Sequence, residues 1–78
     1  MIYIATFYTH AAALLSHRTL TAKGISCRMM PVPRALSSSC GTCVRYEAES
    51  MCEDLLDRDV EQIAQENGST YLVLKTFH

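Results

Sequence analysis

The middle of the chain, residues 31–43, cannot continue a helix or a strand. Pro31 and Pro33 lack a backbone N–H and push the residue before each of them into extended geometry. A serine run and a Cys-x-x-Cys pair, Cys40 and Cys43, follow in the same stretch. We therefore predict a loop here, so that regular structure is divided between the residues before it and the residues after it.

The first part of the chain predicts one strand followed by one helix. Residues 2–8 are rich in β-branched and aromatic side chains and are apolar on both alternating sets, as in a central strand. Residues 10–23 carry apolar side chains at helical spacing. Thr9 is a suitable N-cap for this helix, and Gly24 is suited to the position just after its end.

Three further segments have strand composition or alternation, namely residues 25–30, 42–47 and 71–77. In the second of them, Val44 and Tyr46 are expected to face the helices. The residues between Val44 and Tyr46 and on either side of them are expected to face the other way.

Residues 50–66 predict a second helix, because Ser50 and Glu53 match a capping box and apolar residues follow at helical spacing. The element order is then βαββαβ. It favours an α+β fold, a ferredoxin-like two-layer sandwich with a four-stranded antiparallel sheet and two helices on one face. In that topology Cys40 lies at the same end of the sheet as His10 and the start of the first helix.

Size and charge restrict the class of protein. A chain of 78 residues, 49% hydrophobic, is expected to form one globular domain over residues 1–78. No apolar run approaches the ~20 residues that span a membrane, and the first residues lack the pattern of a signal peptide, so we expect a cytoplasmic protein without membrane contact. All acids lie in residues 47–66, and the basic groups are spread without aromatic interleaving, which disfavours nucleic acid.

The Cys-x-x-Cys pair is the best candidate for chemistry. A thiol is a nucleophile only as the thiolate, and its ordinary pKa is about 8.5. Cationic groups and helix N-termini lower that pKa, and hydroxyls can donate hydrogen bonds to the anion. The groups predicted to stabilise the Cys40 thiolate in this way are Arg34, His10, Ser38 and Ser39. Gly41 permits unusual backbone angles beside Cys40 and leaves room for a partner to approach.

Two other uses of the pair are weighed beside this one. A dithiol redox protein usually places its pair at the start of a helix, whereas a strand pattern follows Cys43. A zinc site would need further ligands from Cys27, Cys52 or a histidine. The sequence has no second Cys-x-x-Cys and no His-x-x-x-His pair, Cys27 is predicted inside a strand, and Cys52 is predicted at the far end of the sheet. We therefore expect no metal and no other cofactor, and a dithiol reaction stays open.

Residues 33–41, Pro-Arg-Ala-Leu-Ser-Ser-Ser-Cys-Gly, resemble the signature of a known family. This is the selenium/sulfur carrier-like family of small bacterial proteins, formerly a domain of unknown function, and the resemblance covers nearly the whole chain. It implies that Cys40 accepts sulfur or selenium as a persulfide or selenosulfide, with Gly41 and the serine run as its setting. Cys43 departs from the signature, and we interpret it as a resolving or protecting thiol.

The resemblance also implies partners. These would be a sulfur or selenium donor protein, such as a cysteine desulfurase, and an acceptor enzyme, while a second copy could cover the open face of the sheet. Whether such a carrier has catalytic turnover of its own is left open. The alternatives are a Cys-x-x-Cys dithiol redox protein and a small protein-interaction module whose cysteines are incidental.

Overall fold

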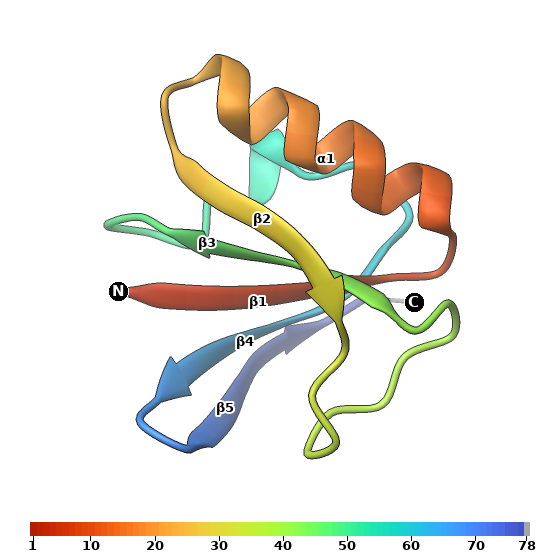
Figure 1. Ribbon diagram of the computed structural model, residues 1–78, viewed down its shortest axis with the longest axis vertical. Helices are drawn as coiled ribbons and strands as arrows, with labels where there is room; N and C mark the ends of the chain where they lie inside the picture. Colours follow the sequence, from red (N-terminus) through yellow and green to blue (C-terminus); the bar gives the residue numbers. More distant parts are fainter. Residues whose placement is uncertain (78) are drawn as a thin grey trace.

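The computed structural model describes residues 1–77, which form one five-stranded sheet and one α-helix (Figure 1). In chain order the elements are β1 (Ile2–Phe7), α1 (His10–Ala22), β2 (Ser26–Pro31), β3 (Thr42–Glu47), the short 3-10 turn η1 (Glu53–Leu55), β4 (Val60–Asn67) and β5 (Thr70–Thr76). The strands lie in the order β2-β3-β1-β4-β5, and every neighbouring pair is antiparallel.

β1 is the central strand, as its composition predicts. Ile4, Ala5 and Phe7 have no exposed surface. Because side chains alternate along a strand, Ala5 and Phe7 point toward α1 while Ile4 points to the opposite face. Both faces of β1 must therefore be covered by other parts of the chain.

α1 covers one face of the sheet, lying over β2, β3 and β1 (Figure 1). Its predicted N-cap is confirmed, because the hydroxyl of Thr9 accepts a hydrogen bond from the N–H of Ala12 at 3.1 Å. Ala12 and Leu20 are among the helix residues buried against the sheet. Gly24 has a φ of +78°, the left-handed conformation that ends many helices.

The prediction of a second helix in residues 50–66 is wrong, and so is the ferredoxin-like sandwich with four strands and two helices. Only η1 turns helically, and β4 takes the place of the expected second half of the helix. Two local features interrupt it. Cys52 has a φ of +51°, and the carboxylate of Asp57 accepts a hydrogen bond from the N–H of Asp59 at 3.0 Å, which favours a turn.

The sheet itself supplies the stronger reason. β3 pairs with only one edge of β1, so the buried N–H and C=O groups on the other edge need a second strand. β4 provides it along the whole of β1. Ile63 and Ala64, which suggested one apolar helix face, instead point to opposite faces of the sheet, where each is fully buried.

β4 and β5 form a hairpin whose two connecting residues are Gly68 and Ser69, because Asn67 pairs with Thr70. Gly68 has a φ of +62°, which two-residue hairpin turns require and other residues adopt only with strain. β5 corresponds to the strand predicted at residues 71–77, and β4 is the fifth strand that the sequence prediction lacked.

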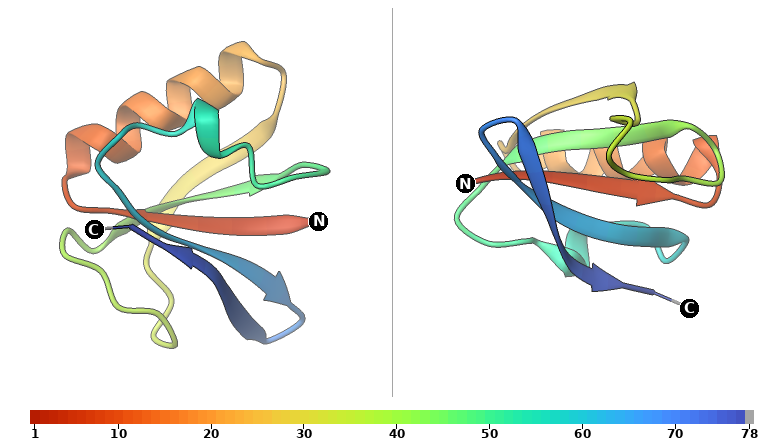
Figure 2. Two further views of the ribbon diagram at one scale, coloured as in Figure 1. Left: turned by 180° about the vertical axis from the view of Figure 1, so that it is seen from behind. Right: turned by 90° about the horizontal axis from the view of Figure 1, so that it is seen from below.

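Hydrophobic clusters lie on both faces of the sheet. The larger one lies between the sheet and α1 and includes the stacked rings of Tyr3 and Tyr46, whose centroids are 5.4 Å apart. The members of the smaller one, on the opposite face, are Ile4, Leu36, Cys43 and Ala64. Leu36 belongs to the loop between β2 and β3, which runs along this face (Figure 2). The face that we expected to be open is therefore partly covered by the chain itself.

Candidate functional site

Backbone hydrogen bonds and one buried side chain fix the path of the loop between β2 and β3, residues 32–41. The N–H of Val32 donates to the carbonyl oxygen of Gly41 at 3.1 Å, and that of Leu36 donates to Pro33 at 3.0 Å. Leu36 is only 9% exposed, since its side chain packs on the sheet. The loop thus has a defined path even though it contains no helix or strand.

A polar clasp holds the second half of the loop to β4. The Glu61 carboxylate accepts from the hydroxyl of Ser39 at 2.8 Å and its N–H at 3.3 Å, and from the hydroxyl of Thr6 at 3.1 Å. The side-chain amide of Gln62 donates to the carbonyl oxygen of Ser37 at 2.6 Å. We call Glu61, Gln62 and the loop atoms they bind the loop clasp.

The clasp brings the end of the loop to the start of α1, as the sequence predicts. The hydroxyl of Ser38 donates to the carbonyl oxygen of Phe7 at 3.4 Å. On the other side of Cys40, the Nδ1 atom of His10 lies 3.4 Å from the hydroxyl of Thr42. Residues flanking Cys40 therefore contact the end of β1 and the first residue of α1.

Cys40 is half-buried at this junction, and its thiol donates to the carbonyl oxygen of Thr42 at 3.4 Å. The next residue, Gly41, has a φ of +75°, and a Cβ built there would meet no atom within 4 Å. The glycine is therefore required by the backbone conformation and not by crowding. The space beside the Gly41 backbone, next to Cys40 in the chain, is open.

Cys43 is in a different environment although it is only three residues away. Its side chain has no exposed surface, and its thiol lies 3.7 Å from the carbonyl oxygen of Pro31. Burial, and to a smaller extent the charge on a nearby Cys40 thiolate, raise the pKa of the Cys43 thiol to about 11. At neutral pH this sulfur is a protonated core group.

The predicted anion-stabilising groups divide into three sets. The start of α1 has no acidic side chain in its first turn, so its positive dipole end faces the junction unneutralised, with His10 beside it. Ser38 and Ser39 use their hydroxyls on Phe7 and Glu61, and so hold the loop's path. Arg34 is exposed and forms no ion pair within residues 1–77.

The remaining cysteines lie elsewhere. The Cys27 sulfur is 3.3 Å from the hydroxyl of Thr21 and 3.6 Å from the carbonyl oxygen of His17, below α1. The Cys52 sulfur is 3.7 Å from the hydroxyl of Ser50. Within the part of the chain that the structure describes, no three His, Cys, Asp or Glu side chains gather as a metal site.

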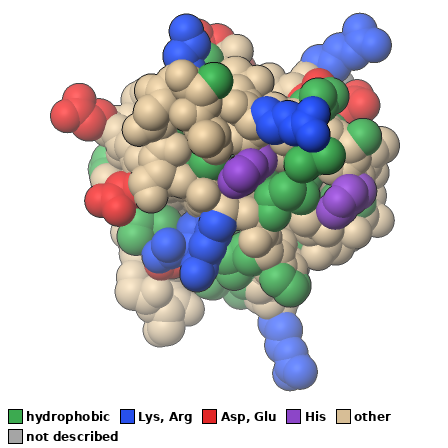
Figure 3. All heavy atoms as spheres, turned by 45° about the horizontal axis from the view of Figure 1, so that its top comes forward, with side chains coloured by type: hydrophobic (Ala, Val, Ile, Leu, Met, Phe, Trp, Pro, Cys, Tyr) green, Lys and Arg blue, Asp and Glu red, His purple; other side chains and the backbone are tan. Residues whose placement is uncertain are grey.

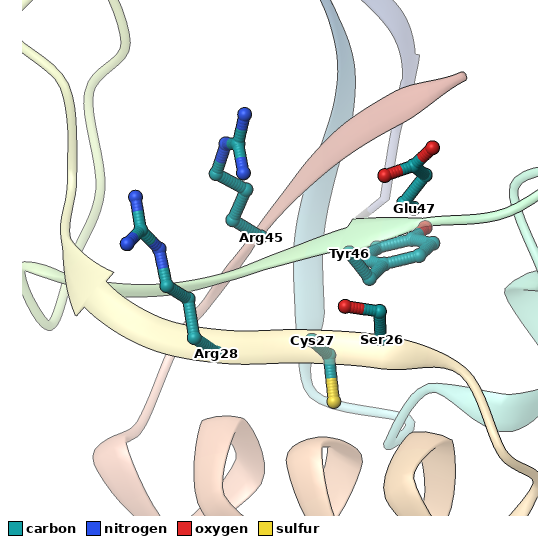
Figure 4. Close-up of a pocket in the computed structure, with 6 residues that line it drawn as sticks. All are labelled: Ser26, Cys27, Arg28, Arg45, Tyr46 and Glu47. Carbon is teal, nitrogen blue, oxygen red and sulfur yellow. The ribbon is translucent and has the colours of Figure 1, made fainter.

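Beyond the loop, the same face of the sheet is polar. Arg28 and Arg45 are cross-strand neighbours and project to one side, whereas Cys27 projects toward the helix (Figure 4). Glu66 on β4 accepts two hydrogen bonds from Arg45, at 3.2 and 3.0 Å. These bonds hold the pKa of the Glu66 carboxyl below its ordinary value. The exposed part of this face is therefore charged.

The face that carries α1 has a different surface. Hydrophobic, histidine and some basic side chains lie in its middle, and acidic and further basic ones lie toward its rim (Figure 3). Leu15 on α1 is half exposed there. No helix in residues 1–77 is long and apolar enough to cross a membrane.

Sequence reasoning missed the two carboxylates and the amide that organise this side of the sheet: Glu61, Gln62 and Glu66. It had placed them on a helix. The signal that could have found them is the two-residue Gly68-Ser69 turn between two β-type segments, which predicts a hairpin and hence a strand before it.

Comparison with known proteins agrees with the resemblance of the loop. No curated protein and no solved structure matches the chain. One family model does match, over residues 2–74, and its description is "Putative Se/S carrier protein-like". The match includes the loop, both cysteines of the Cys-x-x-Cys pair, the first four strands and most of β5. The chain therefore belongs to the Se/S carrier protein-like family.

Proposed function

We propose that the chain carries a sulfur or selenium atom on Cys40, as a persulfide or a selenosulfide. The observation that carries this proposal is the difference among the four cysteines. Only Cys40 lies on a loop next to open space and beside the unneutralised start of a helix. Membership of the carrier-like family supports the same chemistry.

Loading would be a thiol exchange. The Cys40 thiolate attacks the terminal sulfur of a donor protein's persulfide, a new S–S bond forms on Cys40, and the donor's S–S bond breaks to release its thiolate. Delivery repeats the exchange, with a nucleophile of the acceptor attacking the terminal atom and Cys40 leaving as the thiolate. No net oxidant is consumed, and selenium replaces sulfur in the same scheme.

The site supports this exchange in two ways. The first turn of α1 stabilises negative charge at the junction through its dipole. The loop clasp keeps Cys40 at that turn, since Ser39 and Ser37 are tied to β4 on one side of it. The Glu61 carboxylate is occupied by three donors, which reduces its repulsion of an anionic sulfur.

The buried position of Cys43 separates carriage from a dithiol reaction. A resolving thiol would have to attack the Cys40 persulfide as a thiolate, and the raised pKa of Cys43 opposes this. We therefore propose that Cys43 remains a core thiol while the loop is closed, so that the persulfide persists long enough to be delivered.

The test is intact-mass measurement after incubation with a cysteine desulfurase and cysteine. Wild type and Cys43→Ser should gain the mass of one sulfur atom, and Cys40→Ser should gain none. Cys27→Ser and Cys52→Ser are the matched controls and should load like wild type. Loading of Cys40→Ser would refute the proposal. A dithiol redox protein would instead lose the mass of two hydrogens, whether or not the donor is present. That loss should be absent in both Cys40→Ser and Cys43→Ser.

A further inference from the structure

The outer strand β5 is unusual for the edge of a sheet. Leu72, Val73 and Leu74 are 55%, 43% and 40% exposed, which makes three consecutive apolar residues on the surface. Runs of this kind are typical of strands buried on both faces. α1 packs on β1, β2 and β3, and the loop between β2 and β3 is hydrogen-bonded to β4. On β5, Tyr71 packs against the smaller hydrophobic cluster, but the three residues after it remain exposed.

The opposite edge, β2, shows how this chain protects a strand. β2 alternates apolar and polar residues, carries the exposed Arg28, and ends at Pro31, which has no N–H to donate. α1 also covers one of its faces. These features disfavour the addition of another strand at this edge.

β5 has none of these protections. It contains no proline, and its single charged residue is Lys75. The ammonium group of Lys75 donates two hydrogen bonds to the carboxylate of Glu53 on η1, at 2.8 and 2.9 Å. It also lies 5.1 Å from the centroid of the Phe77 ring. The one charge that could block this edge is thus directed away from it.

We propose that β5 is a homodimer interface, in which it pairs antiparallel with β5 of a second copy. The two-fold axis would pass at Leu72, inside the regular stretch before the register shift opposite Ile63 and Ala64. Tyr71 would then lie opposite the second copy's Val73 on both sides of the axis, and aromatic–β-branched pairs are favourable.

The absence of charge from this part of β5 favours a second copy as the occupant. In this register no charged residue lies within Thr70–Leu74 of either chain, so pairing buries no unpaired charge. The same patch serves both subunits, as two-fold symmetry requires. The pairing forms one ten-stranded sheet. It leaves the Cys40 junction uncovered, because Leu72 pairs with Gln65 toward the opposite end of the sheet.

The test is sedimentation velocity over a wide concentration range with Leu72→Lys and Leu15→Lys. Leu15, on α1, is 50% exposed and is the matched control. Wild type and Leu15→Lys should change from monomer to dimer with rising concentration, and Leu72→Lys should weaken dimerisation at least about tenfold, because like charges then oppose each other at the axis. Circular dichroism at low concentration checks that each variant folds, and Val73→Lys replaces Leu72→Lys if that variant does not.

Hydrogen exchange locates the interface independently. Within Thr70–Leu74, the amides that face away from β4 should gain protection as wild type becomes dimeric, while those of β2 should not change. A wild type that stays monomeric at every concentration would overturn the proposal, including the case in which β5 instead binds an extended segment of another protein. Equal dimerisation of Leu72→Lys and Leu15→Lys, or protection gained at β2, would overturn it as well.

Discussion

Cys40 and Cys43 are separated by two residues, yet they belong to different parts of the molecule. Cys40 is at the end of the loop, half-buried beside open space and the first turn of α1. Cys43 is on β3, fully buried beneath Leu36 on the other face of the sheet. A Cys-x-x-Cys spacing therefore does not place two thiols in one environment when its second cysteine lies in a strand. The burial of each sulfur, more than the spacing, decides its chemistry.

Alkylation rates should show this contrast at its largest. With a thiol pKa of about 11, about one Cys43 in a thousand is a thiolate at pH 8, and burial restricts access further. We expect Cys43→Ser to keep the fast reaction of the Cys40 thiol with iodoacetamide, and Cys40→Ser to lose it completely. The Cys43 thiol should react at least about a hundredfold more slowly than the Cys40 thiol. Comparable rates for the two thiols in native protein would remove the basis of the contrast.

Leu36→Ala should reduce the contrast by uncovering Cys43. The substitution removes a buried side chain and should cost about 2–3 kcal/mol in the free energy of unfolding, measured by urea denaturation. It should also speed Cys43 alkylation under native conditions. Leu20→Ala, which opens a cavity on the α1 side instead, is the matched control. If Leu20→Ala speeds Cys43 alkylation as much as Leu36→Ala does, global unfolding and not the loop controls the access of the reagent to the Cys43 thiol.

Alkaline pH should reveal the buried thiol as a loss of stability. Because the folded-state pKa of Cys43 is raised from 9.0 to about 11, the unfolded chain loses this proton first as pH rises. The contribution of the protonated Cys43 thiol to the free energy of unfolding is fully present below about pH 9. It decreases by roughly 1.4 kcal/mol per pH unit between about pH 9 and about pH 11. Cys43→Ala should lack this component, so the stability gap between wild type and variant should narrow over that range. A constant gap would mean that Cys43 ionises normally.

Glu61→Gln should loosen the clasp with the smallest effect on stability. The variant keeps the shape but weakens the hydrogen bonds from Ser39 and Thr6, at a cost of about 1 kcal/mol. Hydrogen exchange of the Ser39 amide should rise, and sulfur loading of Cys40 should slow because the loop is less well placed. Glu49→Gln, at an exposed acid in the connection after β3, is the control. Unchanged Ser39 exchange would show that Glu61 does not hold the loop.

Local signals were enough to predict the first half of the fold. Thr9 and Gly24 mark the ends of α1, Pro31 ends β2, and alternation marks β3. Each of these signals determines the conformation of residues that are close to it in the sequence. The meeting of the loop with His10 also follows from adjacency of strand ends. This part of the site could therefore be derived from the sequence.

The second half depended on a long-range requirement. β4 is a strand because β1 has an unpaired edge, and helical spacing of its apolar residues contains no information about that edge. Glu61 and Gln62 were consequently placed on a helix, and their role in holding Ser37 and Ser39 was missed. The burial of Cys43 could not be predicted either, since it depends on Leu36 returning to the sheet.

The central claim is that the carried atom is on Cys40, and peptide mapping of wild type tests it most directly. Both cysteines lie in the peptide released by cleavage after Arg34 and Arg45, and fragmentation between Gly41 and Thr42 separates them. After loading by a cysteine desulfurase and capping by alkylation, the added sulfur should be found on the fragment that contains Cys40. Added sulfur on Cys43, or on the peptides that contain Cys27 or Cys52, would contradict the account.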